Sequence, residues 1–587
     1  MRIPKPNVDG LTGRLPGLGR LGSRAGRITS AGRGRTGPQA GGDGRHPVIS
    51  RVALVFLVVG VASAAILYDR VEGVRGDSAD AAAEQTFVTP SVTDPSSLDG
   101  AWFCPMGSSN PEGFAAHTVH ISNLSETPLV ANLIVLTGQS SATELLIRYE
   151  VAPLSTRSVP LSEIVQSDPA GAVVEIIGGG GVVGHSVETA SGTAEGPCST
   201  HVSSTWYFAA GRTTRDSHQY LALMNPFPED VRYSVELYRS AGRARKPAAL
   251  TGQEVPANSV RVIDIGVWVG REDTVAAAVT TDRGRLVVER LMTINGDLGP
   301  SGASLQLGVV QPADSWMLPA GRIHDGGGDR VVVFNPSPDQ TATVDIELWP
   351  LNPTDRSLYG LGAIPRELRP GRFEVIDLRT EADQYGIRLP YEVGVSVSST
   401  NDVPVVAERW QFAKQVDTSL IGAGGSAVAP GQATDPATGQ PVPNPEDPAA
   451  GGDGGGDVDV PGILGAEAQT LAQPTANAGI GTSRGTEVLS NRWVIPWVST
   501  PAENATVVVV TSPTDAQVQV RVLLNGELRP PLDATVPAGG RSLVALPTGA
   551  PGVPVLVTSN APVSVEAQVV VPDSRMATVA AVPTVVP

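Results

Sequence analysis

The sequence predicts an all-β protein of tandem immunoglobulin-like antiparallel β-sandwiches, preceded by one N-terminal transmembrane helix. Three observations support this prediction. Glycine and proline number 66 and 50 of the 587 residues, while aromatic residues make up only 4%, a balance typical of short strands joined by many turns. Sequence landmarks recur at a period of about 100 residues, as they do in repeat proteins. One uncharged apolar segment lies close to the N-terminus.

The N-terminal part of the chain has the composition of a cytoplasmic tail followed by a membrane anchor. Residues 1–51 hold ten Lys and Arg against two acidic residues, and residues 52–68 are apolar and uncharged. At helical rise this apolar segment spans about 26 Å, enough for a thin hydrocarbon core. Because positive charge precedes it, we expect a single-pass protein of the cell membrane, with a cytoplasmic N-terminus and the bulk of the chain extracytoplasmic.

Two other interpretations apply to this region. The tripeptide Ala62-Ser63-Ala64 resembles a signal-peptidase site, so cleavage near Ala64 is the alternative to a retained anchor. The basic tail also suits nucleic-acid binding. However, it holds no aromatic residue to stack on bases, and the membrane topology already explains its charge. The favoured prediction is a retained signal-anchor and no nucleic-acid partner.

Each repeat begins with a tryptophan and continues into alternating apolar segments. The tryptophans are Trp102, Trp206, Trp316 and Trp493. A turn dipeptide, such as Asn225-Pro226, follows nineteen residues after three of them. The period-two alternation over 231–237 is typical of a half-buried strand, and a closing hairpin is expected at the end of each unit, for example over 393–409. Six or seven short strands in such a unit predict an antiparallel sandwich of immunoglobulin-like size.

These landmarks divide the chain into eight parts. We expect a basic disordered tail (1–51), the membrane helix (52–68), a spacer (69–97), four sandwiches (98–200, 201–300, 301–423 and 484–587) and, before the last sandwich, a disordered linker (424–483). The linker is rich in Gly, Pro and Ala and holds seven acidic residues and no Lys or Arg, a composition that cannot bury a core. A flexible coil of about 60 residues has a span of roughly 40 Å, so the fourth sandwich is expected to be loosely tethered.

The order of the landmarks resembles a known kind of protein. The tryptophan strand, the Asn-Pro turn, the strand V-P-A-x-S-x-x-x-I-D-L and the ending V-P-V-V-A-E-R are similar to repeats of an actinobacterial family of membrane-anchored exported proteins with no assigned function. The likeness covers roughly residues 100–587, although the first unit lacks both the Asn-Pro dipeptide and the I-D-L ending. The resemblance implies an envelope location and a β-rich exported part, and it brings no catalytic residues.

The two cysteines, Cys104 and Cys198, both fall in the predicted exported part, where disulfides can form. Cys104 takes the place that Phe208, Leu318 and Ile495 have in the sister units, and Cys198 follows the last strand of the first sandwich. We predict a disulfide that joins the start and the end of this sandwich. A redox or metal role is not expected, because the chain has no further thiol and no C-x-x-C motif.

A glutamate recurs near the end of the last strand of each unit, at Glu188, Glu289, Glu408 and Glu566. Two carboxylates that face each other at roughly 5–10 Å can hydrolyse a glycosidic bond, but these four are expected to lie in separate sandwiches. The favoured interpretation is a charge on an exposed strand that discourages edge-to-edge pairing. A carboxylate row that contacts a ligand is the alternative.

The remaining motifs are interpreted as structural. His117 and His120 are three residues apart on a strand, so they point to opposite faces and make a poor metal pair. Residues 178–181 lack the Lys of a phosphate-binding loop and are interpreted as a hairpin turn. Residues 451–459 match a calcium-binding nonapeptide only loosely and only once, and Asn123 opens an Asn-Leu-Ser glycosylation pattern of little weight in a bacterial protein. We expect no metal and no cofactor.

The favoured function is a non-enzymatic structural or interaction module of the cell envelope. Repeated sandwiches and spacers, with no recognisable nucleophile or phosphate loop, support this prediction. The alternative is a carbohydrate-binding or envelope-assembly accessory, in which Trp268, Trp349 and Trp497 would stack on sugar rings if they were exposed. A hydrolase is the third hypothesis. The expected partners are the membrane and a protein or glycan of the envelope.

Overall fold

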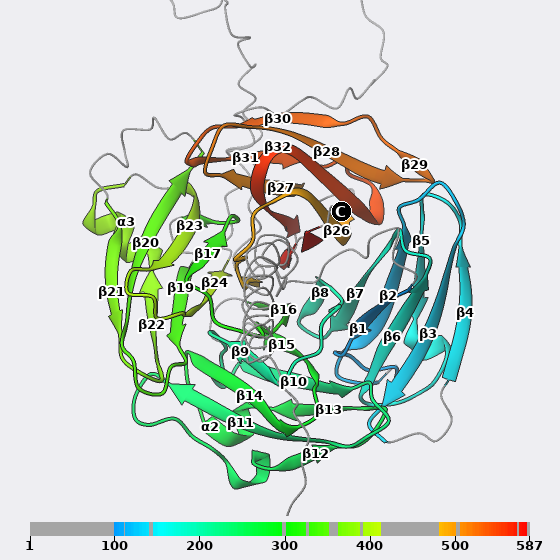
Figure 1. Cartoon of the computed structure of the whole chain (residues 1–587), viewed down its shortest axis with the longest axis horizontal. Coiled ribbons are helices and arrows are strands. Elements are labelled where there is room, and N and C mark those ends of the chain that lie inside the picture. The colour runs from blue at the N-terminus through cyan, green and yellow to red at the C-terminus, as the bar shows by residue number, and fades with distance from the viewer. Residues whose placement is uncertain are drawn as a thin grey trace, which may run out of the picture. The chain divides into compact units, whose positions relative to one another are not determined.

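The computed structural model is almost entirely β-structure. It describes residues 99–571 with gaps at 111, 140–144, 296–300, 324–327, 352–361, 388–390, 413–479 and 501–504, together with 575–580 and 582–583. The tail, the apolar segment 52–68 and the spacer lie outside these described residues. Within them, no helix is both long enough and apolar enough to cross a membrane. The prediction of an all-β chain with several antiparallel sheets is confirmed (Figure 1).

The first unit contributes four strands to each of two sheets. Its strands are β1 (Asp99–Cys104), β2 (Ala116–Asn123), β3 (Leu129–Thr137), β4 (Leu145–Val151), β5 (Ser155–Pro160), β6 (Ala170–Ile177), β7 (Gly181–Thr189) and β8 (Gly192–Pro197), with a short 3-10 helix η1 (Leu161–Glu163) after β5. One sheet has the order β1-β6-β3-β4 and the other the order β5-β2-β7-β8. Trp102 of the first sheet and Val119 of the second share one apolar core. The two sheets therefore pack face to face.

The second and third units repeat this arrangement. The second has β9 (Thr205–Phe208), β10 (Ser217–Asn225), β11 (Val231–Arg239), η2 (Ala248–Leu250), β12 (Gln253–Val255), β13 (Ser259–Asp264), α2 (Gly266–Val269), β14 (Val275–Arg283), β15 (Val287–Asn295) and β16 (Ser301–Leu307). The third has β17 (Ser315–Leu318), β18 (Arg322–Ile323), β19 (Gly328–Asn335), β20 (Ala342–Pro350), β21 (Ile364–Leu368), β22 (Arg372–Asp377), α3 (Leu378–Gln384), β23 (Tyr391–Ser399), β24 (Val406–Phe412) and β25 (Ile480–Ser483). Their sheets have the orders β9-β14-β11-β12, β13-β10-β15-β16, β17-β23-β20-β21 (with β18 also paired to β23) and β22-β19-β24-β25. One parallel residue pair, Ser259 of β13 with Thr137 of β3, joins a sheet of the first unit to one of the second as a single eight-stranded sheet.

The fourth unit uses one long strand in both sheets. It contains β26 (Ser490–Thr500), β27 (Ala505–Ser512), β28 (Ala516–Leu524), β29 (Glu527–Leu528), β30 (Leu532–Val536), β31 (Gly540–Ala545), β32 (Ala550–Val571), β33 (Arg575–Ala580) and β34 (Val582–Pro583). The first half of β32 pairs with β26 and β28, and its second half pairs with β27 and β33. If the two halves of β32 are counted as separate strands, the fourth unit has the same strand order as the other units.

The closing hairpin predicted for each unit lies one strand later than expected. The sixth and seventh strands, such as β6 and β7, belong to different sheets, so residues 178–181 join two sheets and do not form a hairpin turn. The true hairpin pairs the seventh strand with an eighth, as in β7 with β8 and β15 with β16. Because this eighth strand was not predicted, β16 extends the second unit beyond the expected boundary at residue 300.

The predicted linker is an insertion within the third unit. Its last residues form β25, which pairs antiparallel with β24. The rest of it falls in 413–479, outside the described residues. The short connection from β25 to β26, residues 484–489, is therefore what joins the third unit to the fourth. The expected boundary at residue 483 is wrong, because composition marks a segment that cannot pack but does not indicate which strands it connects.

The tryptophan that opens each unit is a core residue, as the repeat pattern predicts. Trp102, Trp206, Trp316 and Trp493 are all at most 2% exposed. In three of them the indole N–H donates to a backbone carbonyl. The acceptors are Leu286 and Val405, each just before the seventh strand of its unit, and Val563 of β32. The same side chain thus performs the same packing role in the second, third and fourth units.

The turn after the second strand is stabilised by a buried side chain. Asn123, Asn225 and Asn335 are completely buried. The amide of Asn225 donates to the carbonyls of Glu229, Val255 and Pro256, and its oxygen accepts from the backbone N–H of Phe227. Asn123 makes an equivalent set of contacts. The amide nitrogen of Asn123 is consequently inaccessible to a glycosyl group. The equivalent contacts also show that Asn123 in the first unit corresponds to Asn225 in the second.

Candidate functional site

Four buried glutamates lie where consecutive units meet, and we call them the interface glutamates: Glu195, Glu289, Glu408 and Glu566. None is more than 4% exposed. Each accepts a hydrogen bond from a backbone N–H at or just after the first strand of another unit. We call the contact between two units a joint. A buried carboxylate needs such donors, because an unpaired buried charge is very costly.

Three joints follow one rule: the glutamate lies on the seventh strand of one unit and accepts from the unit before it. Glu289 accepts from Met106 N at 3.2 Å in the first–second joint. Glu408 accepts from Ala209 N at 2.9 Å and Ala210 N at 3.1 Å in the second–third joint, and Glu566 accepts from Ala320 N at 3.2 Å in the third–fourth joint. Hydrogen bonds to an ionised acceptor are roughly twice as strong as neutral ones.

The fourth joint joins the last unit to the first. Here Glu195, on the eighth strand β8, accepts from Ser499 N at 3.0 Å and also contacts the Ser499 hydroxyl. The seventh strand of the first unit has Gly184 at the relevant position. Gly184 pairs with His120 on β2, as Glu408 pairs with Val332 on β19. A Cβ atom at Gly184 would lie only 3.2 Å from the Cβ atoms of Pro496 and Trp497, so the fourth unit occupies the space a side chain would need.

The interpretation of the recurring glutamates as exposed edge charges is wrong for three of them. Glu289, Glu408 and Glu566 are buried in joints, whereas Glu188 is exposed on β7. Glu188 is also four residues beyond the register position that the other three share, which Gly184 occupies. Counting acidic residues at the ends of strands therefore grouped one surface residue with three interface residues and missed Glu195.

Arginines on the strands reinforce the second–third and third–fourth joints. Arg290 Nη1 lies 2.9 Å from Glu408 Oε2, and both side chains are 1% exposed. Arg541 donates to the Pro319 carbonyl at 2.8 Å and contacts Glu392. Apolar cores also cross these joints: the rings of Tyr238 in the second unit and Phe334 in the third have centroids 4.6 Å apart within one shared cluster. The second–third and third–fourth joints thus combine charge pairing with buried apolar side chains.

Burial affects the acidity of the interface glutamates. It raises the pKa of Glu566 to about 7, although hydrogen bonds from Ser483 and Ala320 oppose this. Burial likewise raises the pKa of Glu408 and of Glu195, against the opposing effects of Arg290 and Ser499 respectively. The raised values reflect removal of the carboxylates from water. The interface glutamates are structural groups held by several donors at once.

The fourth–first joint places a predicted site residue in a buried stack. The indole of Trp497 lies parallel to the imidazole of His120, with ring centroids 3.8 Å apart. The ring nitrogens of His120 lie 2.8 Å from the Ser158 hydroxyl and 2.9 Å from the Ser186 hydroxyl. Burial, and after it the nearby His185, lowers the pKa of His120 to about 3. Trp497 is 8% exposed, so its face is occupied by His120 and is closed to a sugar.

The other two tryptophans proposed for ligand contact lie in separate units. Trp268, in α2 of the second unit, is half-buried against that unit's core. Trp349, on β20 of the third unit, is half-buried and donates to the Ser396 hydroxyl at 2.9 Å. The structure brings neither of them to Trp497. Contact with a ligand stays a prediction for Trp268 and Trp349 as single rings. The three tryptophans do not form one shared binding surface.

The inner strands of all four units meet one another. β16 contacts β8, β25 and β33, and β33 also contacts β8 and β25. A cavity of about 20 Å³ lies between β8, β15, β16 and β25, and Glu195, Glu289, Gln306 and Arg484 help to line it. The fourth unit therefore contacts both the third and the first, which contradicts the loose tether expected from the sequence. That expectation followed from treating residues 424–483 as the connection between sandwiches.

The cysteine prediction agrees with the structure. Cys104 and Cys198 form a disulfide with a Cα–Cα distance of 4.7 Å across 94 residues of chain. Both are completely buried in the core of the first unit. Within the described residues there is no free cysteine and no cluster of His, Cys, Asp and Glu that could hold a metal ion. His117 and His120 point to different joints, as their odd spacing predicts.

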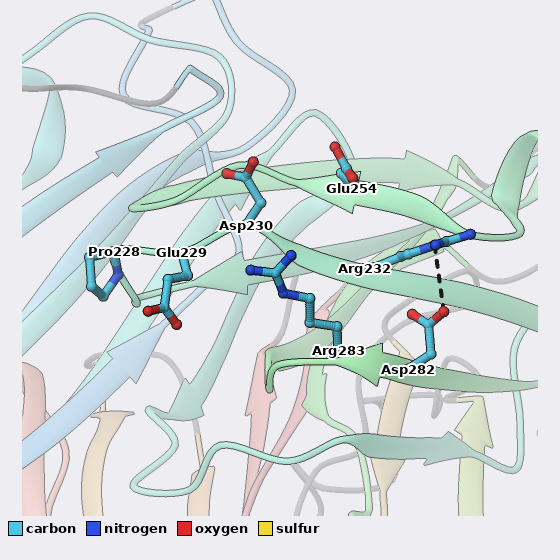
Figure 2. Close-up of a pocket in the computed structure, with 7 residues that line it drawn as sticks. All are labelled: Pro228, Glu229, Asp230, Arg232, Glu254, Asp282 and Arg283. Carbon is cyan, nitrogen blue, oxygen red and sulfur yellow. Dashed lines mark ion pairs between the residues drawn. The ribbon is translucent and has the colours of Figure 1, made fainter.

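One surface pocket lies in the second unit, and none of the interface glutamates lines it. It has a volume of about 490 Å³ and is lined by Pro228, Glu229, Asp230, Arg232, Glu254, Asp282 and Arg283. These residues come from β11 and the turn before it, from β12 and from β14 (Figure 2). Arg232 Nε lies 3.5 Å from Asp282 Oδ2. The lining is polar and mixed in charge, and no sequence motif singled it out.

Sequence reasoning missed Glu195 for a clear reason. No sister strand carries an acidic residue at its position, since β16, β25 and β33 are SGASLQL, IGTS and RMATVA. A signal did exist for the second–third and third–fourth joints. The small residues Ala209, Ala210 and Ala320 directly follow the first strands, and small side chains allow another element to approach the backbone closely.

Comparisons with known proteins leave the function open. No curated protein matches the chain. Three solved structures show weak similarity: Thermotoga maritima 1070 (11% identity, 19% of this chain and 95% of that chain, TM-score 0.17), Streptomyces avermitilis α-L-rhamnosidase complexed with L-rhamnose (12%, 54% and 46%, 0.11) and a tetra-tandem repeat in the extending region of a large adhesion protein (10%, 82% and 97%, 0.09). TM-scores this low support no conclusion. Residues 189–447, which include Glu195, Glu289 and Glu408, match the model of a family of unknown function, DUF5719.

Proposed function

We propose that the protein is a non-enzymatic, membrane-anchored extracytoplasmic protein whose immunoglobulin-like sandwiches act together as a structural or interaction module of the cell envelope. The observation that carries the proposal is the use of the interface glutamates. Glu289, Glu408 and Glu566 each bind the backbone of a neighbouring unit. The recurring carboxylates thus hold units together and are not available to act on a substrate.

The module differs from a flexible string of sandwiches. Because each unit contacts the next and the fourth contacts the first, the outward loops and edge strands are presented in a fixed relation to one another. Such preorganisation lowers the entropic cost of binding a large partner. A disulfide buried in the first unit suits an oxidising extracytoplasmic compartment. A protein or glycan of the envelope is the proposed partner.

The pocket of Figure 2 provides a test that distinguishes a structural or interaction module from an enzyme or a ligand receptor. We expect that Asp230→Asn and Glu254→Gln, made separately in an exported and folded protein, leave cellular function near that of the wild type. Truncation before residue 484, which removes the fourth unit, should impair it. The physical reason is that a contact module depends on its assembled surface, whereas a catalytic carboxylate cannot be replaced by an amide. The measurement is complementation of a deletion strain.

Two controls accompany this test. Protease added to intact, wall-stripped cells should digest the wild type and both variants beyond about residue 70, as expected of an N-terminal anchor. Complete protection of the large C-terminal part would contradict the extracytoplasmic location. If one pocket variant removed function as completely as the truncation while remaining folded, the non-enzymatic proposal would be abandoned and the pocket treated as an active or ligand site.

A further inference from the structure

A chain of three buried titratable residues crosses the first–second joint. His117 Nδ1 lies 3.1 Å from the Ala170 carbonyl oxygen, and His117 Nε2 lies 3.0 Å from His185 Nδ1. His185 Nε2 lies 3.0 Å from Glu289 Oε1. The other oxygen of Glu289 accepts from Met106 N. His185 and Glu289 are 0% exposed and His117 is 2% exposed, so these contacts are closed to bulk solvent.

Counting hydrogens shows that these groups need one more proton than they ordinarily carry. The chain contains three contacts: from His117 to a carbonyl, between the two imidazoles, and from His185 to a carboxylate. Each contact needs one hydrogen. A neutral imidazole carries one N–H, and an ionised carboxylate and a carbonyl carry none. Two neutral histidines therefore supply two hydrogens for three contacts, and a third proton must be bound.

We propose that the first–second joint is a proton-binding site, in which a single proton held on His185 links the first unit to Glu289 of the second. The sister joints support the position of the charge. His185 pairs with Val119 on β2, just as Arg290 pairs with Leu221 and Arg409 with Val331 on the corresponding strands. His185 thus occupies the place of a permanent cation, and Arg290 contacts the next unit's Glu408 as His185 contacts Glu289.

The surrounding groups agree with this assignment. Burial, and after it the charge of His185, lowers the pKa of His117 to about 3, and the same two causes lower the pKa of His120 to about 3. The neighbouring histidines are therefore neutral. On the side of β8, Glu195 lines the same small cavity as Glu289, together with Arg484. Arg290 follows Glu289 on β15 and is engaged by Glu408 and Gln306.

The joint should consequently weaken as the pH rises. In the open joint the imidazole is exposed to water, where an ordinary histidine side chain holds a proton only below about pH 6.5. The closed joint keeps its proton, so above that pH it binds one proton more than the open joint. The closed joint therefore loses stability as the pH increases, and its opening constant rises about tenfold per pH unit. In the second–third joint the corresponding cation is Arg290, which contacts Glu408, and an arginine does not lose its charge over this pH range.

Glu289→Gln is a sharp test because it supplies the missing hydrogen without the charge. The amide oxygen can still accept from Met106 N, and the amide N–H can donate to a neutral His185. In this variant the open joint binds a proton below about pH 6.5 that the closed joint does not, so the closed joint loses stability as the pH falls. Between pH 5.5 and 7.5 the ratio of the wild-type opening constant to the variant's should rise about 100-fold.

The measurement is hydrogen exchange of a peptide containing Met106 in the full-length protein, corrected for the intrinsic pH dependence of exchange, with exposed Glu188→Gln as the matched control. A ratio that changes by less than about threefold over this range would overturn the proposal. A second measurement does not depend on the variant's folding. The ring nitrogens of His185, observed by ¹⁵N NMR in the wild type at pH 7, should both be protonated, and a neutral ring would equally contradict the assignment.

Discussion

Replacing Glu408 by alanine should lower the free energy of unfolding by about 3–5 kcal/mol, the range for removing one partner of a buried charge pair. The side chain accepts from Ala209 N, Ala210 N and Arg290 Nη1. Its removal leaves two buried N–H groups without this acceptor and separates Arg290 from its carboxylate. The measurement is equilibrium unfolding in urea, followed by hydrogen exchange at Ala209 and Ala210.

Two comparisons make this result specific to the joint. Glu188→Ala removes a carboxylate from the same kind of strand, but Glu188 is exposed, so the change should stay within about 0.5 kcal/mol of the wild type. Glu408→Gln should also destabilise, because three donors surround the side chain and an amide presents an NH₂ group to them. If Glu408→Ala cost no more than Glu188→Ala, the account of the interface glutamates as structural groups would be wrong.

Removing the disulfide should have an effect of similar size, but in the first unit. On the chain-entropy model, a bond that closes a loop of this length, 94 residues in sequence separation, contributes about 4–5 kcal/mol. The double variant Cys104→Ala, Cys198→Ala isolates this contribution, since serine would add the cost of a buried hydroxyl. The measurement is the urea midpoint of the transition that exposes Trp102, which is buried in the same core.

The control is the wild-type chain unfolded in the presence of a reductant, where the same loss of stability is expected. The native protein should show no titratable thiol before denaturation, because both cysteines are bonded and completely buried. Two reactive thiols in the folded chain, or an unchanged midpoint for the double variant, would show that the bond does not hold the first unit together.

The repeat could be predicted from the sequence because its landmarks are local. Trp206 and Trp316 are each followed at a fixed distance by the Asn-Pro turn. The tryptophan marks a core position and the asparagine of the turn is buried, and both recur at equivalent places in the strand order. Alternation of apolar residues located most strands. The eighth strand was missed because β25 is only four residues long and β8 is rich in glycine, so neither has a clear alternating pattern.

The joints could not be predicted, because they depend on which units meet. The sequence shows that Glu408 and Arg409 are adjacent, but not that Glu408 reaches the second unit while Arg409 binds Asp329 within its own unit. The fourth–first joint leaves even less signal in the sequence, because Glu195 and Ser499 are 304 residues apart and have no counterpart in the other units. Long-range pairing of this kind leaves no periodic signal in a single sequence.

The central claim is that the four units are held together by a closed cycle of joints and that residues 413–479 are an insertion between β24 and β25. The most direct test is to introduce a specific protease site between Pro445 and Glu446, cleave the purified protein there and apply it to a size-exclusion column without denaturant. The two fragments should elute together, because β25 stays paired with β24 and the fourth unit keeps its joints with the third and the first. Elution of the C-terminal fragment by itself would contradict the closed cycle.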